Sequence, residues 1–132
     1  MAMTGKLAVA AVLLGVAGGT VVAQQAGFTR TPLQTQQISS TTTHQVVQAR
    51  AEFAPGVAAG RHTHPGEEFG YVIEGTLLLE VDGQPARTLK AGEAFFVPAG
   101  AIHDGKNVGS GNLKVLATYV VEKGKPVATP IK

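Results

Sequence analysis

From His44 onward, apolar and polar residues alternate with a period of two along most of the chain. In the stretch "VQARAEFAPG" the apolar residues share one face, as in a half-buried strand: Val47, Ala49, Ala51 and Phe53. Turn signals interrupt the alternation repeatedly, and Asp82-Gly83 is the strongest hairpin signal among them. Roughly eight short strands follow one another, and no stretch after residue 24 has a helical period. The pattern predicts an all-β fold, a barrel or jelly roll.

The first 23 residues have a different pattern. Lys6 precedes an uncharged apolar run, Leu7 to Ala23, that ends in small residues. These features predict a signal peptide that is cleaved after Ala23, and the lack of a twin-arginine pair favours the Sec route. The alternative is an uncleaved membrane anchor, although the run is at the lower limit for spanning a bilayer. We therefore expect export to the periplasm or the exterior, with no membrane attachment after cleavage.

Residues 24–43 are polar, rich in Thr, Gln and Ser, and without hydrophobic period. They predict a flexible lead-in along the edge of the barrel. The folded domain is then expected to cover residues 44–132.

The composition excludes several kinds of chemistry. The 132 residues carry a net charge of +2, with scattered Lys and Arg and 5% aromatic residues, so no nucleic-acid-binding surface is indicated. Cysteine is absent, which excludes disulfides, a thiol nucleophile and thiolate metal ligands. Any metal must therefore be held by nitrogen and oxygen.

Two of the four histidines, His62 and His64, stand one residue apart in a stretch that reads as strand. Side chains at i and i+2 project to the same face, here either into the barrel or out to solvent. Glu68 can add a carboxylate across a turn, and His103 is a candidate fourth ligand from a later turn. Such a set accepts Mn, Fe, Co, Ni, Cu or Zn without choosing among them. A pair of surface histidines without function is the alternative.

Residues 56–75 and 92–107 resemble the two sequence motifs of the cupin superfamily, at the expected spacings. The first motif is filled by Gly56, His62, His64, Glu68 and Gly75, and the second by Gly92, Pro98, Gly100, His103 and Asn107. The resemblance implies a small RmlC-like double-stranded β-helix, in which His62, His64, Glu68 and His103 bind one divalent transition metal inside the barrel. It selects Glu68 over Glu67, which becomes a rim residue. We expect Asn107 to be structural and the motif glycines to occupy turns.

Four protein ligands leave positions on a six-coordinate metal for water, dioxygen or a small molecule. No general base is evident beside the ligands, and no catalytic residue is identified. This favours metal-centred oxygen chemistry, and the resemblance to cupin dioxygenases then implies a metal-dependent, dioxygenase-like enzyme acting on a small molecule. The alternatives are a non-catalytic cupin that binds metal or a small ligand, a metal-assisted lyase or decarboxylase, and a closed structural zinc site.

The residues expected around the metal suggest the kind of ligand. Gly70 should share the inward face of Glu68 and leave space beside the metal. The other expected lining residues are Val72, one of Phe95 and Phe96, and, as further candidates, Ile102, Leu116 and Tyr119. Few charged residues are available besides the ligands, which suits a small aromatic or enolisable compound. By resemblance to small cupins, a homodimer packed through barrel edges is also expected, with "LKVLATYVV" as the contacting strand.

Overall fold

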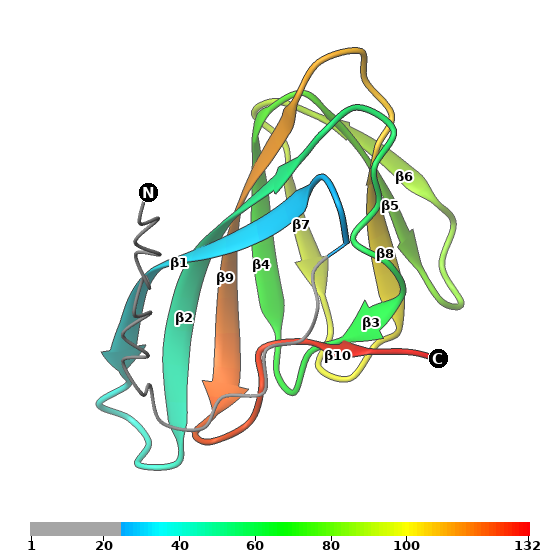
Figure 1. Cartoon of the computed structure of the whole chain (residues 1–132). Coiled ribbons are helices and arrows are strands. Elements are labelled where there is room, and N and C mark those ends of the chain that lie inside the picture. Colours follow the sequence, from blue (N-terminus) through cyan, green and yellow to red (C-terminus); the bar gives the residue numbers. More distant parts are fainter. Residues whose placement is uncertain (1–24) are drawn as a thin grey trace, which may run out of the picture.

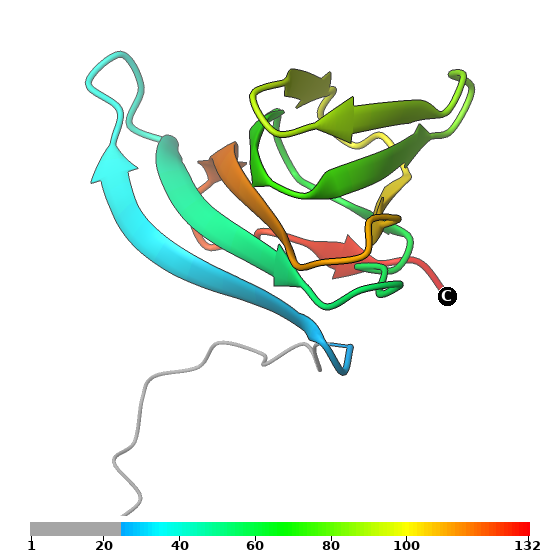
Figure 2. The same ribbon diagram turned by 90° about the horizontal axis from the view of Figure 1, so that it is seen from above.

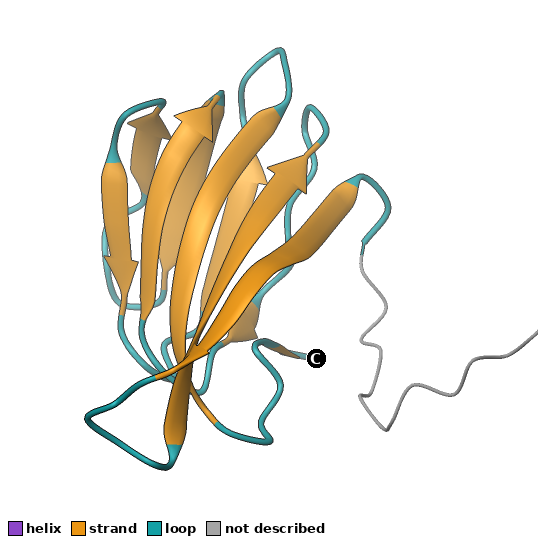
Figure 3. Cartoon of the chain, turned by 90° about the vertical axis from the view of Figure 1, so that its left-hand side faces the viewer, coloured by secondary structure: helices purple, strands orange, loops and turns teal. Residues whose placement is uncertain are grey.

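The computed structural model describes residues 25–132, which consist of strands and loops (Figure 3). Ten strands form two five-stranded antiparallel sheets that face one another across the core (Figures 1 and 2). Within residues 25–132 no helix is long and apolar enough to span a membrane. The predicted all-β jelly roll is confirmed, whereas the predicted signal peptide lies outside the described residues.

The chain passes back and forth between the sheets. The first sheet contains, in spatial order, β1 (Phe28–Gln37), β2 (His44–Phe53), β9 (Leu113–Glu122), β4 (Glu68–Glu74) and β7 (Ala94–Val97). The second contains β10 (Thr129–Pro130), β3 (His62–Thr63), β8 (His103–Asn107), β5 (Thr76–Val81) and β6 (Arg87–Lys90). Because consecutive strands mostly belong to opposite sheets, residues close in sequence, such as His64 and Glu68, lie on facing walls of the core.

Alternating residues of each strand fill the space between the sheets. In β9 every second residue is buried: Leu113, Val115, Ala117, Tyr119 and Val121. In β2 the predicted inward face is confirmed, since Val47, Ala49, Ala51 and Phe53 are all buried. The buried apolar residues form two clusters that meet along β2 and β9. Burial of one face of the central strands, such as β2 and β9, thus helps to fix their register.

The expected flexible lead-in is wrong for residues 28–37. They form β1, an edge strand that pairs with β2 along nearly its whole length, with one register irregularity between Pro32 and Gln34. Only Phe28 of this strand is buried, and Arg30 is half-buried. Backbone pairing therefore holds β1 in place with little apolar burial, which is why the sequence has no hydrophobic period there.

The predicted turn glycines are confirmed by their backbone angles. Gly56, Gly75, Gly92 and Gly100 have φ of 75°, 88°, 92° and 73°. At Gly75 the constraint is also steric, because a Cβ would lie 2.5 Å from the carbonyl oxygen of Asn112. Any other residue would be strained between β4 and β5.

The expected role of "LKVLATYVV" as a dimer edge is wrong. These residues form most of β9, which lies between β2 and β4 and has no free edge.

Candidate metal centre

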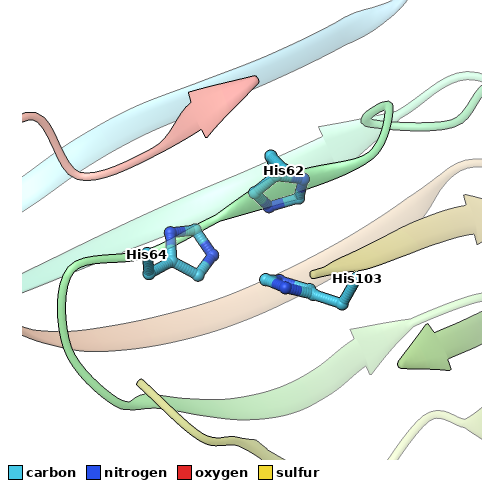
Figure 4. Close-up of side chains that lie close together, drawn as sticks. All are labelled: His62, His64 and His103. Carbon is cyan, nitrogen blue, oxygen red and sulfur yellow. The ribbon is translucent and has the colours of Figure 1, made fainter. Parts of the chain in front are cut away.

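Three histidine side chains from the second sheet converge on the core (Figure 4). His62 lies on β3 and His103 directly opposite it on β8, while His64 follows β3 by one residue. All three are buried, and one imidazole nitrogen from each lies within 4.8 Å of the others. The prediction that His62 and His64 share a face is confirmed, and that face is the interior. This group could hold a metal ion.

Each imidazole is oriented by a backbone carbonyl. The Nδ1 of His62 donates to Gly60 O at 2.6 Å, and that of His103 donates to Ala101 O at 2.9 Å. The Nδ1 of His64 donates to Val127 O at 2.6 Å, from the segment that leads into β10. A carbonyl can only accept, so Nδ1 carries a proton, and in the neutral imidazole the Nε2 lone pair is then free. Three Nε2 atoms are therefore available as metal ligands.

Glu68 approaches the histidines from the opposite sheet. It is the first residue of β4 and is 7% exposed. Its Oε2 lies 3.1 Å from His64 Nε2 and 3.2 Å from His103 Nε2. Within residues 25–132 the buried Nε2 of His64 has no hydrogen-bond partner. Lone pairs of two imidazoles thus face one carboxylate oxygen, an arrangement that a cation between them would stabilise. The set of three imidazole nitrogens and one carboxylate oxygen fits a metal ion that accepts nitrogen and oxygen ligands.

The protonation states of two of these residues favour metal binding. Burial, aided by His103, lowers the pKa of His62 to about 3, so this imidazole is neutral near pH 7. Burial alone would raise the pKa of Glu68, but the imidazoles of His103 and His64, which attract the carboxylate when they carry a second proton, outweigh it and hold this pKa well below its usual range. A metal ion bound at Nε2 would take the place of those protons. A neutral imidazole and an ionised carboxylate are the forms that bind metal.

The loop between His64 and Glu68 is fixed by close packing. A Cβ at Gly66 would collide with the carbonyl oxygen of Val120 on β9, so only glycine allows this approach. Val120 N donates to Glu67 O at 3.0 Å. The Glu67 side chain is half-buried and outside the histidine group, in agreement with its expected place at the rim. The loop therefore positions Glu68 rather than Glu67 toward the imidazoles.

A cavity opens beside the site. Its volume is about 30 Å³, counted as the space that the centre of a water molecule can reach. It is lined by three of the four candidate ligands, His62, Glu68 and His103, and by Phe28, Arg30, Ala51, Phe53, Ala59, Leu77, Leu79, Phe95, Gly105, Val115 and Tyr119. The enclosed space is small, and the cavity is open on one side.

Several predicted lining residues can now be placed. Phe95 points inward and Phe96 outward, with exposures of 8% and 47%, and Tyr119 lines the cavity as expected. Gly70 does not leave space beside the metal position, because the Phe95 ring occupies the place where its Cβ would be. Of the other predicted lining residues, Val72 is buried in the core, whereas Ile102 and Leu116 are not in the lining.

Arg30 is a charged lining residue that sequence reasoning missed. Its Nε donates to the Tyr119 hydroxyl at 3.2 Å, and its guanidinium carbon lies 5.2 Å from the Phe28 ring centroid and 5.7 Å from that of Tyr119. The expectation of few charged groups inside is therefore incomplete. The only available signal was the spacing of Phe28 and Arg30, two residues apart and hence on one face of a strand.

The comparisons with known proteins decide the family. The sequence profile of the cupin domain family (Cupin_2) matches residues 49–119, more than half of the chain. This chain belongs to the cupin family. The predicted resemblance is confirmed.

Curated relatives of this cupin include plant proteins. This chain is 32% identical over 110 residues to germin-like protein subfamily 2 member 2 of Arabidopsis thaliana, and the match covers 80% of this chain and 50% of that protein. It is 30% identical over 122 residues to oxalate oxidase 2 of Hordeum vulgare, covering 81% and 54%. The chain thus spans about half the length of the curated relatives it matches.

Solved structures agree with this assignment. An oxalate oxidase in complex with the substrate analogue glycolate superimposes with a TM-score of 0.65 at 26% identity, covering 92% of this chain and 62% of that one. A cupin-like protein from Thermotoga maritima superimposes with a TM-score of 0.62 at 22% identity, covering 83% of this chain and 82% of that one. This second match shows a similar fold.

Asn107, although part of the cupin motif, lies outside the donor group. Its amide donates to Phe53 O at 3.1 Å and to Gly111 O at 2.8 Å, and its Oδ1 accepts from Gly109 N at 3.0 Å. The residue is fully buried, so the expectation of a structural role is confirmed.

His44, outside the motifs, is half-buried and hydrogen-bonds through Nδ1 with the Thr43 hydroxyl at 2.8 Å.

Proposed function

We propose that this cupin binds one divalent transition metal through His62, His64, Glu68 and His103 and acts as an oxygen-dependent enzyme on a small molecule. The observation that carries the proposal is the convergence of three free Nε2 atoms and one carboxylate oxygen on a buried point, with His64 Nε2 left without a hydrogen bond. The metal is one of Mn, Fe, Co, Ni, Cu and Zn, because this donor set accepts all of them.

A metal held there would supply Lewis acidity and a template for bringing a small molecule and dioxygen together. The protein side chains have separate tasks. The carbonyl-bound histidines keep their Nε2 atoms aimed inward, and Glu68 neutralises one of the metal's charges. The apolar lining, with Leu79 and Phe95 among its residues, excludes bulk water from the reacting groups.

The names of several relatives support the proposal of an oxygen-dependent reaction. Several curated relatives are named oxalate oxidases, and a solved oxalate oxidase binds glycolate as a substrate analogue. The small cavity of this chain agrees with a ligand of similar size. The non-catalytic alternative predicts binding without turnover, and a lyase or decarboxylase predicts turnover without oxygen.

Two measurements test the proposal. Elemental analysis of protein purified from its native compartment should find about one metal ion per chain, and Glu68→Gln should lose it. Oxygen uptake by the metal-loaded protein over a panel of small acids, diketones and catechol-like compounds should then reveal an oxidisable substrate. A metal-free native protein would refute the metal centre, and uptake that is equal for wild type and Glu68→Gln would refute the oxygen chemistry.

We further propose that the chain is exported by the Sec route, which the apolar run before Gln24 supports. The metal would then bind after translocation, because the ligands come together only on folding. Mass spectrometry of the N-terminus of protein from the culture or periplasm tests this, with Gln24 expected as the first residue. A protein that retains Met1 in that fraction would contradict cleavage.

We also propose a homodimer that forms through the outer face of β4 and β7. Exposed apolar side chains on this face include Phe69, Tyr71, Ile73 and Phe96, and the rings of Phe69 and Phe96 are 5.2 Å apart. Phe69→Lys should shift the sedimentation coefficient to that of a monomer, whereas Leu33→Lys, at an equally exposed apolar residue of β1, should not. A wild-type protein that sediments as a monomer at high concentration would overturn the proposal.

A further inference from the structure

Arg30 reaches the cavity with donors to spare. Its Nε is used by the Tyr119 hydroxyl, but its guanidinium forms no ion pair with any carboxylate in residues 25–132. Arg50 and Arg61, by contrast, pair with Glu52 and Asp82. The terminal nitrogens of Arg30 also form no hydrogen bond within the described part of the chain. Arg30 thus presents an uncompensated charge and a planar pair of donors.

The charge balance of the cavity makes this arginine significant. Among the lining residues, the groups with a permanent charge near pH 7 are Arg30 and Glu68, and most of the remainder are apolar. The positive charge of a divalent metal would exceed the negative charge of the Glu68 carboxylate, and Arg30 would add another positive charge. The cavity would then be net positive, so an anion is the ligand that compensates it at low cost.

The size of the cavity limits that anion. Only about 30 Å³ of space beside the histidines can be reached by the centre of a water molecule, which favours a short ligand. Arginine presents parallel N–H donors that match the two oxygens of a carboxylate. We propose that Arg30 binds the carboxylate of a small aliphatic acid in this cavity and so determines selectivity for anionic ligands. This inference rests on the proposed function, since the same cavity would carry the metal.

Arg30 also has a structural role that must be separated from ligand selection. It packs over the rings of Phe28 and Tyr119 and donates to the Tyr119 hydroxyl. Loss of that packing would lower the melting temperature and would weaken every ligand alike. Selection of a carboxylate, by contrast, changes the ratio of affinities for a charged ligand and its neutral isostere.

The test uses glycolate and glycolamide, which differ in charge and are nearly equal in shape. Calorimetric titrations would compare the metal-loaded wild type with Arg30→Met, which keeps an unbranched apolar stem. Arg50→Met is the matched control, since it removes an arginine from the neighbouring strand, β2. The preference for glycolate over glycolamide should fall by about tenfold to a hundredfold in Arg30→Met, the range expected for a charge-assisted hydrogen bond. It should be unchanged in Arg50→Met and intermediate in Arg30→Lys.

An unchanged preference in Arg30→Met, in protein with normal metal content and a cooperative melting transition, overturns the inference while leaving the metal centre intact. Failure of the wild type to bind metal refutes the proposed function instead. The same titrations on chelator-treated protein then test Arg30 by itself. Absence of glycolate binding to either form also overturns the inference.

Discussion

The stability of the metal-free protein should depend steeply on pH because of His62. Burial lowers the pKa of this imidazole from 6.5 to about 3. In the unfolded chain the same group takes up a proton below pH 6.5, while the folded protein resists protonation until about pH 3. Lowering the pH therefore favours the unfolded state, and the free energy of unfolding falls.

The size of this effect follows from the two pKa values. At pH 7 the unfolded chain gains little from protonation of His62, whereas at pH 5 it gains RT ln(1 + 10^(6.5 − 5)), about 2 kcal/mol. The folded protein takes up almost no proton at this site at pH 5 as long as the folded pKa lies below about 4. The expected loss between pH 7 and pH 5 is thus about 2 kcal/mol.

The assay compares urea unfolding of chelator-treated wild type and His62→Gln at both pH values. The variant cannot take up the proton, so its stability should fall by about 2 kcal/mol less than that of the wild type over this interval. Comparing the two losses removes contributions from other titrating groups and any direct cost of the substitution. Equal losses in the two proteins would show that His62 is not buried as a neutral base, and the geometry argued for the centre would be wrong.

Three further substitutions test other parts of the structure. Glu68→Gln should lower the metal affinity by about a hundredfold or more, measured by competition with a chelator, whereas Glu67→Gln at the rim should leave it unchanged. Gly70→Ala should cost about 1–3 kcal/mol in urea unfolding, and less in a Phe95→Leu background, because the added methyl group meets the Phe95 ring. Additive costs in that cycle would contradict the packing. Asn107→Ala removes three hydrogen bonds of a fully buried side chain and should cost about 3 kcal/mol or more, and a loss below about 1 kcal/mol would refute its structural role.

The sequence predicts most of the strands after residue 44 because these strands bury one face. The alternation of Val47, Ala49, Ala51 and Phe53 is a direct record of that burial. The same alternation places His62 and His64 on one face, and the motif spacing adds Glu68 and His103. The sequence does not predict which nitrogen of each imidazole is free. That depends on carbonyl partners, one of which, at Val127, comes from the far end of the chain.

The strands that the sequence predicts and the strand that it does not predict, β1, differ in what holds them in the fold. The candidate ligands lie on or beside β3, β4 and β8, whose burial leaves a strong pattern, whereas Arg30 lies on the edge strand β1, held mainly by backbone pairing. Because backbone pairing holds β1, a different residue at position 30 would lose the contacts with Phe28 and Tyr119 but would leave the strand and the histidines in place. If Arg30 selects the ligand as proposed, metal binding and ligand choice reside on separate strands. Substitutions at Arg30 would then alter which small molecule binds while the four candidate metal ligands stay in place.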